Sequence, residues 1–229
     1  MELKRRRLQG VLNILSFNRH FYIIGLLVLA ILILLLSYLS WPLFWIWILV
    51  GAFGYGLIAP LLVSAYVYDL SGYYNFDWLA HNNISQSNPK HIANINAGFD
   101  ETSFILKSKF PETEISVFDF YNSENHTEPA IVRARKVSAI YPGTKSIESN
   151  SIPCEDESLD LIFLLSSAHE IRSYAERVSF LKECKRVLKS SGKVITVEHL
   201  RDIPNFLAFS IGFTHFFSRR EWMSAFNEA

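Results

Sequence analysis

A glycine and an aspartate in the second half of the sequence stand at the spacing of a nucleotide-binding unit. Gly98 follows a short apolar segment, and Asp119 comes 21 positions later (119 − 98) at the end of the segment ISVFDF. Glycine lets a backbone turn approach a ligand closely, and an acidic residue about 20 positions further on can accept hydrogen bonds from both hydroxyls of an adenosine ribose. With one glycine, the pattern also fits an ordinary strand-end aspartate.

The segments around these residues alternate between strand and helix patterns. Strands are predicted at 91–96, 115–120, 145–148, 159–165 and 193–198, and helices at 100–110, 127–140, 174–189 and 218–226. Gly192 is expected to cap the third helix, and Arg135 to be solvated on the second. This alternation predicts an α/β fold, a Rossmann-like, mostly parallel sheet with flanking helices and right-handed crossovers. Ligands of such sheets bind beyond the carboxyl ends of the strands.

Two later stretches carry a more specific pattern. Glu148 precedes Ile152-Pro153 and then Asp160, which opens an apolar run; Arg186-Val187-Leu188-Lys189 leads through Ser190, Ser191 and Gly192 into the next strand. This pattern resembles class I S-adenosylmethionine-dependent methyltransferases. Their fourth strand opens with an aspartate after a leucine-proline pair, and a helix ending in Arg-Val-Leu-Lys-Pro-Gly leads into the fifth. The resemblance covers roughly residues 91–202 and is more specific in its second half.

The resemblance implies S-adenosyl-L-methionine as the cofactor and no metal. Asp119 would bind the ribose, and Glu148 would lie near the adenine amino group, where the family usually has aspartate. Asn94 stands at the acidic position of the family's first motif, Gly98 at its middle glycine, and Ser166 follows the fourth strand, facing the methyl donor.

The glycine motif departs from the family at its other two positions. Asn96 and Asp100 replace glycines there, which narrows the turn. Asp100 also adds negative charge near the methionine carboxylate, so it would help only if the ammonium or sulfonium of the ligand were close.

His169 and His199 follow the fourth and fifth predicted strands. If the acceptor is a hydroxyl, an imidazole with a pKa near neutrality suits the role of general base, so both are catalytic candidates. Each also fits a hydrogen-bonded loop histidine. Glu170 with Arg172, and Glu198 with Arg201, fit ion pairs that orient the loops.

The first third of the chain predicts a membrane anchor. Residues 21–68 contain no charged side chain, and one bilayer crossing takes about 20 apolar residues, so this run predicts two spans, at 21–39 and 43–67. Pro42 breaks the helix between them. A signal peptide has a shorter apolar core, whereas a buried hairpin in a soluble protein stays an alternative.

Charge and cysteine content extend this hypothesis. The cluster Lys4-Arg5-Arg6-Arg7 before the first span predicts a cytoplasmic N-terminus, and two spans return the chain to the cytoplasm. Anionic lipid headgroups are the expected partner of the cluster, not nucleic acid, because 22 basic residues balance 22 acidic ones. Cys154 and Cys184 share no metal-ligand spacing, which makes zinc unexpected, and two lone cysteines fit a reducing compartment.

The predicted organisation has three parts: a basic N-terminus with the two-span hairpin at 1–68, an interfacial connector at 69–90, and the methyltransferase-like domain at 91–229. The apolar segment 205–217 is too short to span a bilayer. It fits an acceptor pocket, a surface resting on the membrane, or a plain core helix. The family's final strand pair is expected to be missing from the sheet.

The leading hypothesis is a membrane-anchored methyltransferase whose acceptor is lipophilic, such as a quinone, isoprenoid or lipid. The alternative is a non-catalytic membrane protein that keeps the fold to bind a ligand or partner. A nicotinamide-dependent oxidoreductase is a weaker third reading, because the chain lacks a fuller glycine fingerprint and a suitably spaced tyrosine–lysine pair.

Overall fold

The structure is a computed structural model that describes residues 5–81, 84, 88–124, 129–136 and 139–229. These residues fall into two compact units. The helical unit consists of Arg5–Trp78 and Asp202–Phe213, and the sheet unit consists of Leu79–Arg201 and Thr214–Ala229. Residues 202–213 therefore belong with the first third of the chain, although they follow the last strand of the sheet in sequence.

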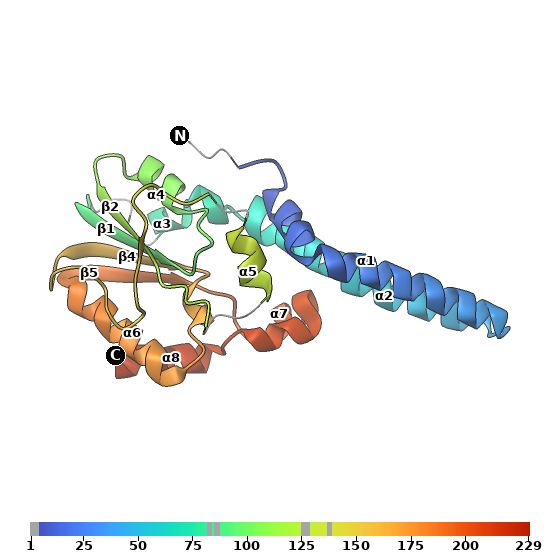
Figure 1. Ribbon diagram of the computed structural model, residues 1–229. Helices are drawn as coiled ribbons and strands as arrows, with labels where there is room; N and C mark the ends of the chain where they lie inside the picture. Colours follow the sequence, from blue (N-terminus) through green and yellow to red (C-terminus); the bar gives the residue numbers. More distant parts are fainter. Residues whose placement is uncertain (1–4, 82–83, 85–87, 125–128, 137–138) are drawn as a thin grey trace. The chain divides into compact units, whose positions relative to one another are not determined.

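The helical unit is built on a hairpin of two long helices, α1 (Gln9–Tyr38) and α2 (Leu43–Ser64) (Figure 1). Pro42 immediately precedes α2, which agrees with the predicted break. Both helices are long and apolar enough to cross a membrane. Their large apolar side chains face outward, as shown by Phe21, which is 62% exposed, and Leu34, which is 70% exposed. Such an outward-facing apolar surface suits a lipid solvent and is rare on soluble proteins.

Asp69 joins the two ends of the hairpin. Its carboxylate accepts hydrogen bonds from the backbone N–H groups of Gly10 (2.9 Å) and Val11 (3.4 Å), in the first turn of α1. Arg5 lies 3.7 Å from the same carboxylate. The first residue of α1 has no side-chain cap of its own, so Asp69, from the short π-helical turn η1 (Ala65–Leu70) after α2, satisfies those backbone donors. A 3₁₀ turn, η2 (Tyr73–Asn75), and a short α-helix, α3 (Trp78–His81), follow.

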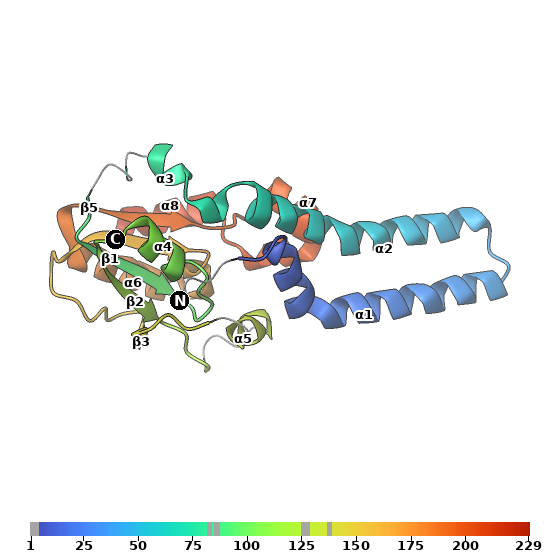
Figure 2. The same cartoon turned by 90° about the horizontal axis from the view of Figure 1, so that it is seen from above.

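The segment that returns to the helical unit forms helix α7 (Ile203–Phe209) and the start of the 3₁₀ segment η4 (Ser210–His215). Asp202 caps α7 by accepting from the backbone N–H of Asn205 at 2.9 Å. Helix α7 lies beside α2 (Figure 2), and the hydroxyl of Tyr55 on α2 donates to the backbone carbonyl of Leu207. The predicted apolar segment is therefore a partner of the hairpin.

The sheet unit contains five parallel strands in the order β3-β2-β1-β4-β5. They are β1 (His91–Asn96), β2 (Glu114–Asp119), β3 (Lys145–Ser146), β4 (Leu159–Leu165) and β5 (Leu188–Val197). Ile92, Ile162 and Phe163 are completely buried on the two central strands. Burial on both faces explains the near-continuous apolar run of β4, whereas β1 also buries two polar residues, Asn94 and Asn96. The predicted α/β fold is confirmed.

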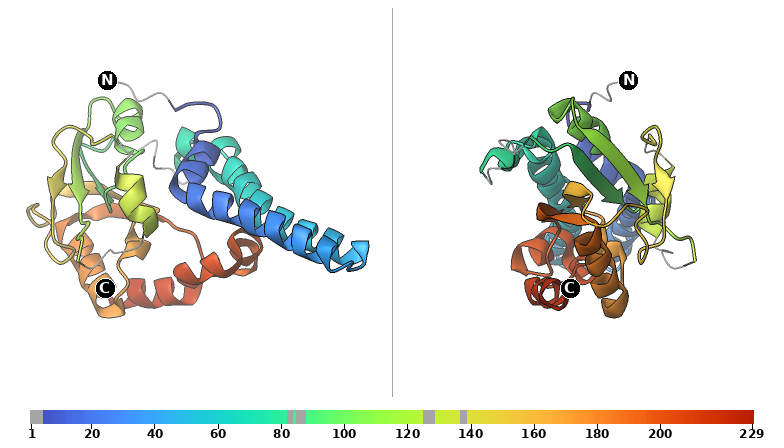
Figure 3. Two further views of the ribbon diagram at one scale, coloured as in Figure 1. Left: turned by 45° about the vertical axis from the view of Figure 1, so that its right-hand side comes forward. Right: turned by 90° about the vertical axis from the view of Figure 1, so that its left-hand side faces the viewer.

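Helices cover both faces of the sheet (Figure 3). Helix α4 (Ser103–Lys109) lies on one face, and α6 (Tyr174–Val187) with α8 (Arg219–Glu228) lies on the other. Helix α5 (Pro129–Arg135) follows β2 in sequence. It is shorter than the predicted helix at 127–140, of which residues 127–128 and 137–138 lie outside the described part.

Gly192 is not a helix cap, contrary to the prediction. Helix α6 ends at Val187, and β5 starts at Leu188. An irregularity in the β4–β5 register lies here, because Leu159 pairs with Leu188 while Leu161 pairs with Lys193. A Cβ at position 192 would lie 3.0 Å from the carbonyl oxygen of Asp160. The same Cβ would lie 2.7 Å from Cγ of Leu188, so both the Leu188 side chain and the neighbouring strand crowd position 192 at this bulge.

Candidate active site

The strand order reverses between β1 and β4, so the carboxyl ends of these strands define the expected site. Asn96, the last residue of β1, accepts a hydrogen bond from the backbone N–H of Gly98 at 2.7 Å. Gly98 has φ +85°, a conformation that side chains strongly disfavour. Asn96 is also in register with Asp119 at the end of β2. Asn96, Gly98 and Asp119 thus line one cleft, together with Asp100, Arg135 and Tyr141.

Asn94 and Asp100 stabilise the turn after β1. The Asn94 amide donates to the hydroxyls of Thr102 (2.9 Å) and Ser103 (2.7 Å). One carboxylate oxygen of Asp100 accepts from the backbone N–H groups of the same two residues, each at 2.9 Å. Asp100 replaces a family glycine, and its charge is directed at the amino end of α4. The substituted loop is therefore held by hydrogen bonds from Asn94 and to Asp100.

Asp119 forms an ion pair with Arg135. Its Oδ1 accepts from the backbone N–H of Tyr121 at 2.9 Å, and its Oδ2 lies 2.7 Å from Nη1 of Arg135. The Arg135 guanidinium also lies 3.9 Å above the ring of Tyr121, and a Cβ at Gly98 would overlap it. The sequence predicted that Arg135 is solvated, but the structure places its guanidinium in an ion pair with Asp119. Its side chain, which is 31% exposed, reaches into the cleft.

Ser166 and Glu148 occupy different surroundings. Ser166 follows β4 with φ +52°, and its backbone N–H donates to the carbonyl of Val197 at 2.8 Å, which ties the end of β4 to β5. Glu148 follows β3 and is exposed. It is not among the described residues that line the cleft. The adenine role of Glu148 and the cofactor role of Ser166 stay predictions.

His169 lies between two carboxylates in the 3₁₀ turn η3 (Ala168–Glu170) after β4. Its Nδ1 is 2.6 Å from Oε2 of Glu198, and its Nε2 is 3.5 Å from Oε1 of Glu170. The other oxygen of Glu198 accepts from the backbone N–H groups of Ser167 and Ala168. Burial disfavours the charged imidazole, but Glu198 and Glu170 outweigh it and raise the pKa of His169 to about 10. An imidazolium is therefore the favoured form at neutral pH.

Three further aromatic rings complete this side of the site. The ring of His199 stacks on Phe216 with centroids 5.0 Å apart, and Phe216 also meets the ring of His169 edge-on at 6.0 Å. The ring of His215 is perpendicular to that of His169 at 5.1 Å. The structure therefore brings both predicted histidines to the carboxyl end of β4 and β5, on either side of Phe216.

Comparison with known proteins gives a family for this unit. Residues 125–196 match the methyltransferase domain family. This match supports a methyltransferase fold of the class I type for the sheet unit. The demethylmenaquinone methyltransferase of Thermotoga maritima is 29% identical over 140 residues, which cover 61% of this chain and 56% of that protein. The chain thus spans little more than half the length of that relative.

Solved structures of the same kind include two S-adenosylmethionine-dependent methyltransferases. One, from Methanosarcina mazei, has 19% identity and a TM-score of 0.46, and the match covers 66% of this chain and 82% of that one. The other, from Aquifex aeolicus, has 18% identity and a TM-score of 0.44, covering 70% and 82%.

The family implies S-adenosyl-L-methionine as the methyl donor, and the cleft of the methyltransferase domain suits its nucleoside in residue type. A glycine with positive φ and a strand-end carboxylate face each other across it. Its free space is about 60 Å³, which holds a few water molecules and no nucleoside. The Arg135 guanidinium lies in this cleft, paired with Asp119 and against Gly98.

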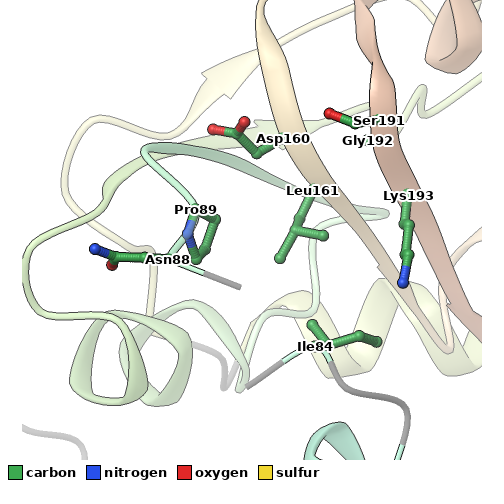
Figure 4. A pocket seen from close by; sticks show the side chains of 8 residues that line it. All are labelled: Ile84, Asn88, Pro89, Asp160, Leu161, Ser191, Gly192 and Lys193. Carbon is green, nitrogen blue, oxygen red and sulfur yellow. The ribbon is translucent and has the colours of Figure 1, made fainter. Parts of the chain in front are cut away.

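A second cleft of the methyltransferase domain lies at the opposite, amino ends of the strands (Figure 4). Asp160, Leu161, Gly192 and Lys193 line it. Asp160 accepts from the backbone N–H groups of Lys90 and His91, each at 2.9 Å, and from Lys189 at 2.8 Å. The aspartate that opens the fourth strand is therefore structural, because it joins β1 and β5 to β4.

Sequence reasoning missed Arg135 and His215 as site residues. Arg135 lies in a segment with two other basic residues, Arg133 and Lys136, and looked like part of a solvated helix face. His215 lies in the apolar segment that was recognised as a substrate-shaping candidate, and a lone histidine among aromatic residues was the signal that could have identified it.

Proposed function

We propose that this protein is a membrane-anchored S-adenosylmethionine-dependent methyltransferase that acts on a lipophilic acceptor of the quinone class. The methyltransferase domain supports the reaction type. The anchor is supported by the two long apolar helices with outward-facing side chains. The predicted cytoplasmic placement of the N-terminus and the domain follows from the basic cluster before α1.

One observation carries the choice of a lipophilic acceptor. The chain leaves the sheet unit after Arg201, joins the helical unit for residues 202–213, and returns at Thr214, directly before His215 and Phe216. The excursion therefore begins and ends among the residues that surround His169 and His199. Helix α7 in this excursion packs beside α2 and exposes Ile203 (75%) and Leu207 (55%). An acceptor dissolved in the bilayer would approach along such an apolar segment.

The quinone class rests on the relative from Thermotoga maritima, whose name states that it methylates demethylmenaquinone. A quinol ring carries hydroxyl groups and an isoprenoid tail, so it needs both a polar pocket and an apolar path. Histidines beside Phe216 and the exposed face of α7 supply surfaces of these two kinds.

The site residues have separate roles in cofactor binding and proton transfer. Asp119 holds the ribose, and the turn from Asn96 to Gly98 lets the backbone approach the donor. His169, held as an imidazolium between Glu198 and Glu170, does not accept a proton at neutral pH, so the base that takes the acceptor proton is His199. Methyl transfer then depends mainly on alignment and on exclusion of water, for which the aromatic side chains around His199 are suited.

Cofactor binding by the full-length protein in nanodiscs tests the proposal. Calorimetry with S-adenosylmethionine is expected to show binding that Asp119→Ala weakens about 10- to 100-fold, because a charged acceptor of two hydrogen bonds is lost. Glu114→Ala, at the other end of the same strand, is the matched control and should bind like the wild type. Radiolabelled methyl groups should then pass to a demethylated quinol in the same nanodiscs.

A second candidate is a membrane protein that keeps the fold without catalysis. The Arg135–Asp119 pair favours it, because the arginine sits where the nucleoside would lie. Absence of binding to wild type at millimolar cofactor, in protein that is folded by circular dichroism, would support this candidate against the enzyme.

A further inference from the structure

Three side chains beyond the carboxyl ends of β4 and β5 bring their ligand atoms together. His169, Glu170 and His215 each offer one nitrogen or oxygen, and these atoms all lie within 4.8 Å of one another. Oε1 of Glu170 is central, at 3.5 Å from Nε2 of His169 and 3.9 Å from Nε2 of His215. We propose that this cluster binds a divalent transition-metal cation of the zinc or iron(II) class.

The spacing of the three atoms is close to what one ion requires. Two ligand atoms, each about 2.1 Å from a tetrahedral zinc ion, lie about 3.4 Å apart. The His169–Glu170 distance of 3.5 Å already meets this value, and the His215–Glu170 distance of 3.9 Å needs a closure of about half an ångström. The three ligand atoms all lie within 4.8 Å of one another, and His215, whose side chain is 20% exposed, has the furthest to move toward a shared ion.

Glu198 supplies the outer support that metal-binding histidines usually have. Its Oε2 lies 2.6 Å from Nδ1 of His169, and its Oε1 is fixed by the backbone N–H groups of Ser167 and Ala168. A histidine that donates its Nδ1–H to a carboxylate directs the lone pair of Nε2 at the ion, and such partners fix both tautomer and ring orientation. Here that lone pair points toward Glu170.

Burial makes a cation at this point favourable. His169 and Glu170 are each 8% exposed. The buried carboxylates of Glu170 and Glu198 flank His169, and their negative charge at the contact between Nε2 and Oε1 of Glu170 calls for a cation there, either a second proton on His169 or a metal ion. A second proton on His169 would relieve this contact alone, whereas a metal ion would also recruit His215.

Arg172 holds the two ligand-bearing segments together. Its Nη1 donates to the backbone carbonyls of His169 at 3.1 Å and of His215 at 2.6 Å. The segment after β4 and the segment before α8 are thus fixed to each other independently of the ion. A preorganised pair of segments lowers the cost of assembling the metal site.

Two histidines and one carboxylate leave coordination positions open, the arrangement found in catalytic zinc and non-haem iron(II) sites. At the acceptor side of the sheet such an ion would polarise an acceptor oxygen as a Lewis acid. This use rests on the proposed function, whereas metal binding itself does not.

Metal content of the full-length protein tests the inference. Protein purified without chelator is expected to hold close to one zinc or iron per chain by mass spectrometry. After treatment with EDTA, titration with Zn²⁺ should be stoichiometric and should raise the unfolding temperature. His215→Ala and the isosteric Glu170→Gln should each weaken zinc binding at least tenfold, and Glu198→Gln about 10- to 100-fold.

His91→Ala is the matched control, because His91 also lies 3.2 Å from a carboxylate, that of Glu114, but at the amino end of β1. It should leave the zinc affinity unchanged. The inference is overturned if the wild type neither holds nor titrates zinc or iron(II), or if Glu170→Gln, with its circular dichroism intact, binds as tightly as the wild type. Neither readout depends on S-adenosylmethionine, so the result stands apart from the outcome for Asp119.

Discussion

Arg135 and Asp119 meet across the cofactor cleft, with 2.7 Å between Nη1 and Oδ2. The guanidinium that pairs with this carboxylate also covers Tyr121 and the Cα of Gly98. The Arg135 guanidinium thus pairs with the Asp119 carboxylate, which we propose binds the ribose of the cofactor. The proposal requires the cofactor to displace this arginine from Asp119.

Arg135→Gln is expected to bind S-adenosylmethionine about twofold to fivefold more tightly than the wild type. The reason is that a partly exposed ion pair contributes up to about 1 kcal/mol, which the cofactor no longer has to displace. Calorimetry on the full-length protein measures the change, with Arg133→Gln on the same helix as the control. Weaker binding by Arg135→Gln would show that the guanidinium contacts the cofactor instead of competing with it.

Gly98→Ala is expected to lower the free energy of unfolding by about 1–3 kcal/mol, because its φ is +85°. The new Cβ also displaces Arg135, so the double variant Gly98→Ala with Arg135→Ala should lose less than the sum of the single changes. Gly143→Ala is the matched control, since its φ is +81° and a Cβ added there would meet no other atom within 4 Å. Additive losses in the Gly98–Arg135 cycle, measured by urea denaturation, would exclude the clash.

Glu221 makes α8 sensitive to acid. Burial raises the pKa of this carboxyl, but the hydrogen bonds from Ser218 and the Arg201 guanidinium outweigh burial and lower it to about 2. A folded pKa below the unfolded value means that the stabilisation is complete above about pH 4.5 and is lost as the pH falls toward 2.

Hydrogen exchange of the α8 amides at pH 6 and pH 3 measures this effect. Protection should fall at pH 3 in the wild type, after correction for intrinsic exchange. Glu221→Gln should already be less protected at pH 6 and change little between the two pH values. Equal losses in both proteins would assign the acid sensitivity to another group. Glu114→Gln serves as the control.

Leu207→Lys on α7 is expected to impair methyl transfer to a long-chain quinol in vesicles and to spare transfer to a water-soluble short-chain quinol. Leu207 is 55% exposed on the segment that packs with α2, and a lysine at a lipid-facing position is costly. The KM for the long-chain acceptor should rise several-fold. Met223→Lys is the matched control, because Met223 is 50% exposed on α8 in the sheet unit. An equal effect on both acceptors would place α7 outside the acceptor path.

Local patterns predicted the framework well. The apolar run 159–165 predicted β4 to the residue, because a strand buried on both faces carries few polar residues, and residues 91–96 predicted β1 equally well. Pro42 marked the start of α2 for an equally local reason. The α/β class and the strand that carries Asp119 followed from this pattern.

Long-range contacts were harder to predict. Gly192 resembled a helix cap because its need for a small residue comes from the backbone of Asp160 on another strand. Arg135 resembled a solvated residue because its partner is 16 positions earlier, and His215 contacts residues 45 positions away. Periodicity records which face a side chain takes, whereas these pairings depend on how separate elements meet.

The hydrogen bond from Tyr55 to Leu207 has a practical meaning for handling this protein. A soluble fragment that starts after the hairpin would leave α7 without α2. It would expose an apolar surface on the segment that precedes His215. Such a fragment should self-associate through this surface, so its oligomeric state and stability would differ from those of the full chain.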